Sequence, residues 1–487
     1  MTVRITGRSL DRAALVRVAR DRETVDLDPA AADRMAATRS VLTAAVANGQ
    51  VVYGTTTAVG VLKRVATDAS GADGYASWML AQHLVGQGPA APRDVVRATM
   101  ARLANHLAEG SPGARPEVAQ RLIDLLNADD LPDVHAWGSI GQADLAPLSE
   151  IGVRVVRDLD LKPGEGIALL DNNAFATAWA ALAVEDADEL VETMDVAAAL
   201  SLDGFAANPS MLDVAIADVR PYPGLRESID RLRVLLAGSA IWEAPPRNLQ
   251  DPLSFRNVPQ LLGAFRDALR HLDAVLAVEL NANQGNPIVV TPGDRVVAVA
   301  NFEILPLAAA LDYVRVVLAS VLDAAAERVV KLLGAPWSGL PTGLVPIAAT
   351  AESGLTYLSL AAQSLAVEGR LLAAPVSFEV VSTSHAEGIE DRTTMAPVAA
   401  RRLGEQVAIG RSLAAIELAV AAQAAEVRGL RLGRGTAAAV DVVRRHVPFL
   451  RQGDRVPPMD ALVAAIAEHE IAAAADEALG GADDDRP

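Results

Sequence analysis

The sequence predicts an all-α protein built on a central bundle of long helices, with a loop-rich N-terminal region. Of its 487 residues, 51% are hydrophobic, most of them alanine, leucine and valine, whereas only 3% are aromatic. Because β-sheets prefer β-branched and aromatic side chains, this mixture favours closely packed helices. A chain of this length can also bury a large core.

The first part of the chain, residues 1–200, is expected to alternate short helices with glycine-rich loops. The main interruptions are the glycine-rich loops at 53–60, 138–147 and 164–173. These loops hold the motifs on which the functional hypothesis depends.

The second part, residues 201–479, is expected to form the long-helix bundle and the C-terminal helices. In 308–333, apolar residues such as Leu311, Val314 and Leu318 recur every three or four positions, which is the period of one helix face. The same pattern covers 261–281, 355–373 and 405–431. Helices this apolar bury more than one face, in a bundle or at subunit contacts. The acidic end, residues 480–487, is expected to be a disordered tail.

Charge and cysteine content exclude several classes of protein. The formal net charge of −18 argues against a nucleic-acid partner, since phosphate binding needs a basic surface. With no cysteine, the chain has no disulfide, thiolate metal site or cysteine nucleophile. Charged residues interrupt the N-terminus early, and the longest uncharged run, Leu332 to Ala351, contains three prolines. We therefore expect a cytoplasmic protein without a membrane or metal partner.

Six short segments resemble, in the same order, the motifs of the aromatic amino acid ammonia-lyase family. Tyr53–Gly60 is similar to the family's YGVNTGFG loop, and Gly138–Leu148 to its GSVG…DLAPL core. The remaining matches are Gln250–Arg256 to QDxYSLR, Asn281–Pro287 to an NSVTDNP-like stretch, Asn301-Phe302 to an NF pair, and Thr383-Ser384 with Glu390-Asp391 to TS…QEDHVSM. This resemblance implies an all-α fold, a homotetramer, and active sites that combine loops from several subunits.

The resemblance breaks where the family makes its prosthetic group. In the family, Ala-Ser-Gly between GSVG and DLAPL cyclises to a methylidene-imidazolone ring that captures the substrate amine. Here only Gln142 and Ala143 lie between Gly141 and Asp144, so the loop is one residue shorter and has no serine. Ser139 is a poor substitute, because the branched Ile140 follows it. The cofactor is therefore predicted to be absent.

Two residues that the resemblance assigns to catalysis and carboxylate binding remain. Tyr53 matches the family's base, which removes the β-proton of the substrate. A tyrosine has a pKa near 10 and would need a positive environment to act as a phenolate; otherwise it is a packing residue. Arg256 matches the arginine that holds the substrate carboxylate, a task that suits a bidentate guanidinium.

Further positions bear on the substrate. The resemblance places Asn286 and Phe302 in the pocket. His83 stands where histidine accompanies histidine or tyrosine substrates, and Glu390 where histidine ammonia-lyases carry their catalytic-site glutamate. A carboxylate can accept a hydrogen bond from an imidazole N–H. The substrate hypothesis is an imidazole-type amino acid derivative, although a lone histidine is more often structural.

The departures from the family pattern gather around the missing ring. Asp171 replaces an asparagine that supports the ring, and Leu253 replaces a second functional tyrosine. An ionised Asp171 would attract a cationic leaving group. We therefore hypothesise a lyase that needs no electrophile because its substrate, such as a trimethylated histidine, already carries a good leaving group. The alternatives are a dehydratase, isomerase or cyclase of a specialised biosynthesis, and an inactive homologue that binds a ligand or assembles with other subunits.

Overall fold

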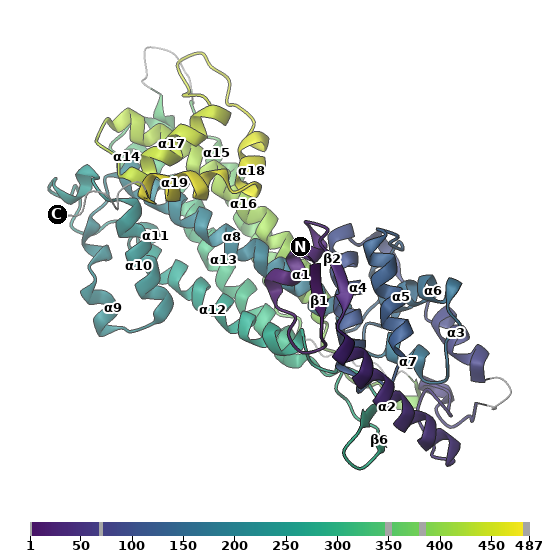
Figure 1. Cartoon of the computed structure of the whole chain (residues 1–487). Coiled ribbons are helices and arrows are strands. Elements are labelled where there is room, and N and C mark those ends of the chain that lie inside the picture. Colours follow the sequence, from purple (N-terminus) through teal and green to yellow (C-terminus); the bar gives the residue numbers. More distant parts are fainter. Residues whose placement is uncertain (1, 68–71, 346–352, 379–385, 481–487) are drawn as a thin grey trace. The chain divides into compact units, whose positions relative to one another are not determined.

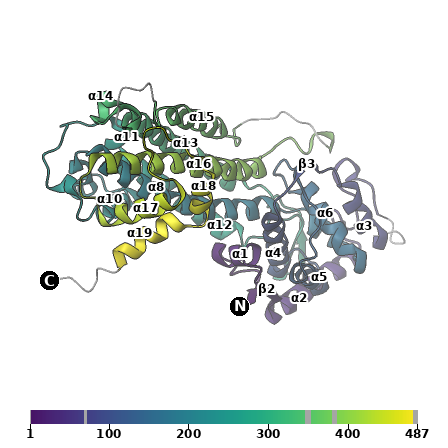
Figure 2. The same ribbon diagram turned by 90° about the horizontal axis from the view of Figure 1, so that it is seen from above.

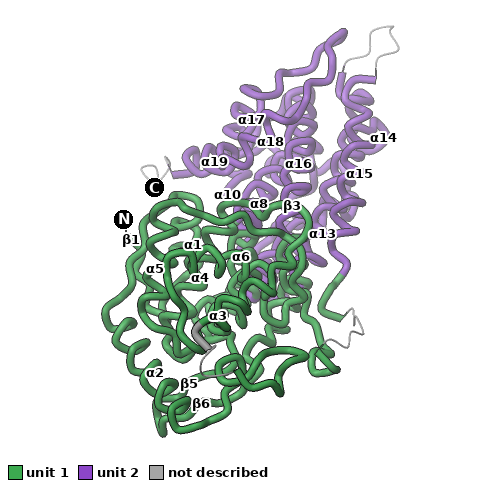
Figure 3. The backbone as a smooth tube through the Cα atoms, turned by 90° about the vertical axis from the view of Figure 1, so that its right-hand side faces the viewer, with its two compact units in different colours: residues 1–185, 272–312, 375–401 green, residues 186–271, 313–374, 402–487 purple. Residues whose placement is uncertain are grey.

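The computed structural model describes residues 2–67, 72–345, 353–378 and 386–480, and these are mostly helical (Figures 1 and 2). The prediction of an all-α fold is confirmed. The chain divides into two compact units (Figure 3): unit 1 is residues 1–185, 272–312 and 375–401, and unit 2 is residues 186–271, 313–374 and 402–487. The expected linear division at residue 200 does not coincide with these discontinuous units. Thr383, Ser384 and all but the first residue of the acidic tail lie outside the described residues.

Unit 1 consists of short helices and three pairs of short strands. Its elements are β1 (Thr2–Ile5), α1 (Arg12–Ala19), β2 (Thr24–Leu27), α2 (Pro29–Ala47), α3 (Ala72–Gln82), β3 (Gln87–Ala90), α4 (Arg93–Glu109), α5 (Pro116–Asn127), β4 (His135–Trp137), α6 (Leu145–Val155), α7 (Glu165–Leu170), β5 (Ile288–Val290) and β6 (Arg295–Val297). The pair β1–β2 is parallel, and the pairs β3–β4 and β5–β6 are antiparallel.

Local signals in the sequence explain where several of these helices begin and end. Asp11 caps α1 by accepting a hydrogen bond from Ala14 N, and Asp28 caps α2, which starts with proline. Helix α4 ends at Gly110, whose φ of 105° suits a residue without a Cβ. These boundaries fix the connections that carry the site.

Helix α4 is the centre of unit 1. It contacts α1, α2 and α5, and nearly all of its residues are buried. Arg102, Asn105 and His106 lie on one face at helical spacing. Arg102 donates hydrogen bonds to Glu279 O and Ala282 O, at 3.0 and 2.7 Å, and Asn105 donates to Leu280 O at 2.9 Å. This face of α4 therefore holds the segment that leads to Asn286.

Unit 2 contains several shorter helices and the larger part of each long helix. The shorter helices are α9 (Ala215–Val219), α10 (Pro223–Leu235), α11 (Leu253–Arg256), α14 (Ala335–Ser338), α15 (Leu358–Leu372), α17 (Arg434–His446), α18 (Asp460–Ala467) and α19 (Glu470–Gly480). The boundary between the units falls inside the long helices α8 (Ala174–Phe205), α12 (Val258–Glu279), α13 (Leu305–Leu333) and α16 (Ala396–Arg428).

Within unit 2, the long helices α8, α13 and α16 pack side by side. A Cβ on Gly410 of α16 would lie 2.5 Å from Leu190 Cδ2 of α8 and 3.4 Å from Leu322 Cδ2 of α13. Arg328 and Glu417, both almost fully buried, form a bidentate ion pair with N–O distances of 2.6 and 3.0 Å. Ser201 of α8 donates to the same carboxylate at 2.7 Å. The predicted bundle is thus held by close packing and by a polar contact among three helices.

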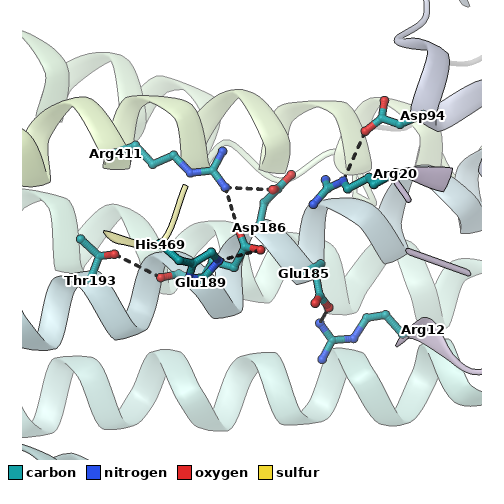
Figure 4. A network of polar contacts seen from close by, with 9 residues as sticks. All are labelled: Arg12, Arg20, Asp94, Glu185, Asp186, Glu189, Thr193, Arg411 and His469. Atoms are coloured by element: carbon teal, nitrogen blue, oxygen red, sulfur yellow. Dashed lines mark hydrogen bonds and ion pairs between the residues drawn. The ribbon is translucent and has the colours of Figure 1, made fainter. Parts of the chain in front are cut away.

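A second network of polar contacts in unit 2 links α8 to α16 and to the segment before α19 (Figure 4). Arg411 donates to Asp186 and Glu189 of α8, at 2.9 and 3.0 Å. His469 Nε2 lies 2.8 Å from Glu189 Oε1. This contact joins the connection between α18 and α19 to α8.

The long helices were predicted closely, but one short helix was not. The predicted segments 261–281, 308–333 and 355–373 correspond to α12, α13 and α15, whereas α16 begins earlier than expected, at Ala396. The interpretation of 164–173 as a loop was wrong, since α7 occupies 165–170. The fully buried Glu165 anchors the start of α7 by accepting from Lys162 N and from Arg115, contacts that no local pattern reveals.

Three stretches are long and apolar enough to cross a membrane by length and composition, namely Glu165–Phe205, Leu305–Leu333 and Ala396–Arg428. In their most apolar windows, 100%, 61% and 78% of the residues are buried inside the protein. They also carry the buried ion pair of Arg328 and Glu417, which a lipid-facing helix would not contain. We interpret them as core helices of the bundle.

Candidate active site

Unit 1 contains a cavity of about 500 Å³, which we call the main cavity. This volume is in the range of small-molecule sites. The predicted site residues that line it are Tyr53, His83, Gln142, Asp171, Asn286, Phe302 and Glu390. The structure thus brings together side chains that are more than 300 positions apart in the sequence, although their roles stay predictions.

The loop 53–60, which we call the tyrosine loop, folds back on itself and places Tyr53 at the main cavity. Gly60 N donates a hydrogen bond of 3.0 Å to the Tyr53 hydroxyl, which closes the loop. Gly54 has a φ of 65°, and a Cβ there would stand 2.9 Å from the side chain of Ile167 on α7. Glycine is therefore needed at position 54, because the loop backbone lies against α7.

The surroundings of Tyr53 oppose ionisation of its hydroxyl. Burial raises the pKa of Tyr53, and the carboxyls of Asp171 and Glu390 raise it further, whereas the hydrogen bond from Gly60 N lowers it. A tyrosine base requires a positive environment, and these two carboxyls act in the opposite direction. A cation bound beside Tyr53 would reverse that effect.

Asp171 faces the main cavity from the end of α7. Its backbone N donates to Ile167 O at 2.8 Å, and its side chain is hydrogen-bonded by Asn286. Asn286 is itself oriented by Val299 N, which donates to Asn286 Oδ1 at 2.9 Å. Burial, together with the nearby Glu390, raises the pKa of Asp171 to about 8. At neutral pH the ligand-free site therefore holds mostly a neutral carboxyl, where the sequence hypothesis needed an ionised one.

His83, Glu390 and Phe302 complete the predicted lining. His83 Nδ1 lies 2.8 Å from Met79 O, and since a carbonyl only accepts, Nδ1 carries the proton and Nε2 is an acceptor in the neutral ring. Glu390 Oε1 is 3.9 Å from the point where a Cβ on Gly60 would stand, so its carboxylate lies near the end of the tyrosine loop. Phe302 is fixed through its backbone carbonyl, which accepts from Asn173 Nδ2 at 2.8 Å.

The degenerate loop 141–144 is tightly held. A Cβ on Gly141 would lie 2.2 Å from Thr394 Oγ1, and Gly141 O accepts from that hydroxyl at 2.7 Å. Ala143 adopts a left-handed conformation with a φ of 61°. Asp144 is fully buried, and burial raises its pKa to about 6 despite hydrogen bonds from Ala176 N and Ser139 Oγ. The Ser139 hydroxyl, 2.7 Å from Asp144, thus has a structural role at the start of α8.

Gln142 takes part in a polar network at the wall of the main cavity. Its side-chain amide donates to Glu303 at 2.8 Å, and Arg392 Nε donates to the same carboxylate oxygen at 2.7 Å. Burial raises the pKa of Glu303, but the hydrogen bonds from Arg392 and Gln142 outweigh it and lower the pKa. Gln142, one of the two residues that stand in place of the family's tripeptide, is therefore bound to Glu303, which directly follows the Asn301-Phe302 pair.

Arg256 is not among the residues that line the main cavity. It ends α11 in unit 2, where Nε donates to Asp251 O at 2.7 Å and Nη1 donates to the side chain of Gln250. Leu253, which stands in place of the second tyrosine, is exposed. The role of Arg256 in carboxylate binding stays a prediction that depends on assembly.

Sequence reasoning missed two cations of the main cavity, Lys63 and Arg392. Lys63 Nζ donates to Ala386 O and Glu387, at 3.1 and 3.0 Å, and so ties the segment after the tyrosine loop to the segment before Glu390. The only signal for Arg392 was its position beside the matched Glu390-Asp391 pair.

Among the described residues, no group of three or more histidine or acidic side chains is arranged to hold a metal.

The arrangement suits an amino acid that carries a positive charge. Two carboxyls, Asp171 and Glu390, lie near a tyrosine hydroxyl, and His83 offers a ring acceptor. Apolar side chains such as Val59, Met79 and Ile167 form the other walls. A cationic group between the carboxyls would stabilise their ionised forms and would also favour the phenolate of Tyr53. A proton could then be removed from a carbon held next to Tyr53.

Comparisons with known proteins agree with the motifs. The family model described as aromatic amino acid lyase matches residues 10–158 and 154–445. A histidine ammonia-lyase of Deinococcus radiodurans is 33% identical over 477 residues, which is 92% of this chain and 90% of the relative. Ergothionase from Treponema denticola, solved with desmethyl-ergothioneine sulfonic acid, superposes with a TM-score of 0.91 at 26% identity, covering 97% of this chain and 99% of the other. Tyrosine aminomutase from Streptomyces globisporus gives 0.89 at 27% identity, with 98% and 99% covered.

Proposed function

Because this chain belongs to the aromatic amino acid lyase family, we propose that it eliminates an amine from a cationic α-amino-acid derivative without a methylidene-imidazolone group. The product is an α,β-unsaturated acid. One observation carries the proposal: the loop that would form the ring is replaced by Gln142 and Ala143, while Tyr53 and two carboxyls line the cavity.

The residues of the loop do not fit the prosthetic group. Ring formation needs a serine that loses water, and neither residue between Gly141 and Asp144 has a hydroxyl. Ser139 is committed to the buried Asp144, and Ile140 O accepts hydrogen bonds from Thr394 N and Met395 N. Gln142 is bound to Glu303. We therefore route no step of the reaction through that group.

A quaternary ammonium substrate makes the electrophile unnecessary. The Tyr53 phenolate takes the proton from Cβ, the C–H electron pair forms the Cα–Cβ double bond, and the Cα–N bond breaks. The nitrogen keeps the electron pair of the broken Cα–N bond and leaves as neutral trimethylamine, so no further acid is needed. A plain ammonium group is a much poorer leaving group, and histidine itself is not the expected substrate.

The charges of the main cavity support this substrate class. Asp171 and Glu390 offer two carboxyls to a cation, and His83 and Glu390 can bind an imidazole ring through its nitrogens. Our substrate hypothesis is an Nα-trimethylated histidine, with or without sulfur on the ring. The likeness to an ergothionase, whose solved ligand is derived from ergothioneine, agrees with this choice.

The carboxylate of the substrate is assigned to Arg256, and this assignment requires assembly. We propose a cytoplasmic homotetramer in which a neighbouring subunit supplies Arg256 to the cavity, as the family's combination of loops from several subunits implies. The partners are then a small amino acid derivative and further copies of this chain, with no nucleic acid and no membrane.

A second candidate is a family member with an altered reaction. The match to a tyrosine aminomutase favours it, because that protein covers the chain as completely as the ergothionase does. An isomerase would yield a product that still contains its nitrogen. An inactive, ligand-binding homologue would yield no product at all.

A turnover assay by mass spectrometry separates these functions. The panel is histidine, phenylalanine, tyrosine, trimethylhistidine and its 2-thio analogue, and both the unsaturated acid and the released amine are measured. We expect trimethylamine from the trimethylated substrates and no ammonia from histidine. Robust ammonia release from a plain amino acid would overturn the proposal, and an isomeric product that retains the amine would establish the second candidate.

Cation binding is expected to release a proton from Asp171. With a pKa of about 8, this carboxyl is roughly 90% protonated at pH 7, and a cation bound beside it favours the ionised form. The affinity for trimethylhistidine should then rise about tenfold from pH 7 to pH 9. Calorimetry in buffers of different ionisation enthalpy, in a Tyr53→Phe background that slows turnover, measures both quantities.

The matched variant for this test is Asp171→Asn, which keeps the shape of the side chain but cannot titrate. It should bind the ligand more weakly at pH 9, with no proton release and a flat profile above pH 7. Wild-type affinity that does not change between pH 7 and pH 9 would show that Asp171 does not face the cation.

A further inference from the structure

A small chamber lies behind the main cavity in unit 1. Its volume is about 10 Å³, and Ile167, Asp171 and Asn286 line both spaces. The chamber is also lined by Thr55 of the tyrosine loop and by His106 of α4. Asp171 therefore lines both the main cavity and this second, smaller space.

Two polar side chains of the chamber are buried without protein partners. Neither ring nitrogen of His106 nor the hydroxyl of Thr55 has a hydrogen-bond partner among the described residues. These side chains are 1% and 3% exposed. A buried polar group without a hydrogen bond is costly, so such groups indicate a bound polar molecule in or near the protein.

The size and lining of the chamber suit one water molecule. A cavity of roughly 10–15 Å³, measured by the space open to a water-sized sphere, is the minimum that holds a water, and buried waters make about three hydrogen bonds. Thr55, His106 and Asp171 offer three polar partners. Gly285 and Gly164 form other parts of the wall, and a Cβ on Gly285 would lie 3.0 Å from Asp171 O and 3.4 Å from His106 Cε1.

We propose that one ordered water joins Thr55, His106 and Asp171, and that His106 is a positioning residue which, through this water, favours the ionised form of Asp171 in the main cavity. The link to catalysis rests on the proposed function, whereas the bound water does not. Thr55 stands where the family's YGVNTGFG pattern has valine, and Asp171 where the family has asparagine, so two departures from the family build one chamber.

The charges around the chamber fix the direction of the effect. Burial, followed by the charge of Arg102, lowers the pKa of His106 well below its usual value, so the ring is neutral and has one N–H donor. That N–H can donate to the water, and the water can donate to the Asp171 carboxylate. The titratable and charged side chains that line the main cavity together with Asp171 are Glu390, Tyr53, His83, Lys63, Asp391 and Arg392. Loss of His106 weakens the hydrogen bond from the water to the ionised carboxylate. Because the neutral carboxyl does not depend on that hydrogen bond, the pKa of Asp171 should rise.

The sign of a stability change tests the water in the ligand-free protein. Thr55→Val keeps the shape of the side chain and removes the hydroxyl. If the hydroxyl binds a water, the variant loses a hydrogen bond and its Tm falls; if the chamber is dry, the variant removes a buried unpaired group and its Tm rises. The control is Thr38→Val, because Thr38 is also buried and its hydroxyl donates to Gly110 O at 2.6 Å. We expect Thr55→Val to lower Tm as Thr38→Val does, and a rise in Tm would overturn the proposal.

The positioning role of His106 has a separate readout. In the calorimetric titration with trimethylhistidine, His106→Leu should move the midpoint of the pH profile upward by about one unit, which corresponds to the loss of one hydrogen bond to a carboxylate. Thr55→Val, which removes another partner of the water without changing His106, should move it in the same direction. An unchanged midpoint in both variants would refute the positioning role. Failure of the substrate proposal would instead abolish ligand binding in the wild type and leave the Tm test intact.

Discussion

Replacement of Tyr53 by phenylalanine is expected to reduce amine elimination by a factor of about 10² to 10⁴, the usual contribution of a general base. Tyr53 is the tyrosine whose hydroxyl reaches the main cavity, and no other side chain there is assigned to the β-proton. Since its pKa is raised, only a small fraction of the free protein carries the phenolate near neutral pH. The wild-type kcat/KM should therefore increase with pH across the neutral and mildly alkaline range.

The matched control is Tyr75→Phe. The hydroxyl of Tyr75 also accepts a hydrogen bond from the backbone of the same loop, at Val59, but Tyr75 does not line the main cavity. This variant should keep its turnover within a few-fold of wild type, whereas Tyr53→Phe should not. Initial rates of trimethylamine release, with thermal unfolding as a check of folding, measure the difference. Equal rates for the two variants would remove tyrosine from the mechanism.

Replacement of Glu417 by alanine is expected to lower the free energy of unfolding by about 3–5 kcal/mol, the usual cost of leaving one partner of a buried ion pair alone. Glu417 is fully buried on α16, and its removal leaves the guanidinium of Arg328 and the hydroxyl of Ser201 without their carboxylate. Urea denaturation followed by circular dichroism measures the loss as a lower midpoint.

Two further variants define what the pair contributes. The double variant Arg328→Met/Glu417→Leu replaces both charges by apolar groups and should recover most of the lost stability. Glu327→Ala removes the carboxylate of a partly exposed i,i+4 pair with Lys331 on the same bundle and should leave the midpoint nearly unchanged. A midpoint of Glu417→Ala equal to that of Glu327→Ala would mean that the buried pair does not stabilise unit 2.

Periodicity predicted the long helices well, because their apolar spacing is a local property of the sequence. The pattern in 308–333 corresponds to α13, which runs from Leu305 to Leu333. Helix α7 could not be predicted in this way: it is six residues long, and its start is held by contacts of Glu165 with Arg115, 50 positions away. The same limit applies to the contact of His469 with Glu189 on α8, because the two residues are far apart in the sequence.

The candidate site was found through resemblance to a family, and its details were not. Motif order suggested that Tyr53, Asp171 and Glu390 share a pocket, which the main cavity agrees with. No pattern linked Gln142 to Glu303 or indicated that His106 lines a chamber together with Asp171. The ionisation of Asp171 was also beyond the sequence, because it depends on burial and on a carboxylate more than 200 positions away. Chain folding sets these pKa values, and residue type alone does not.

The bonding of the loop around Gly141 has an evolutionary consequence. Its carbonyl is held by Thr394, the space beside it excludes even a methyl group, and Gln142 is bound to Glu303 and through it to Arg392. Inserting one residue and restoring a serine would push Gln142 out of register with Glu303 and would press the longer loop against Thr394. Restoring the family's tripeptide would therefore require several simultaneous substitutions, so under the proposed mechanism no single insertion would give this protein back its electrophile.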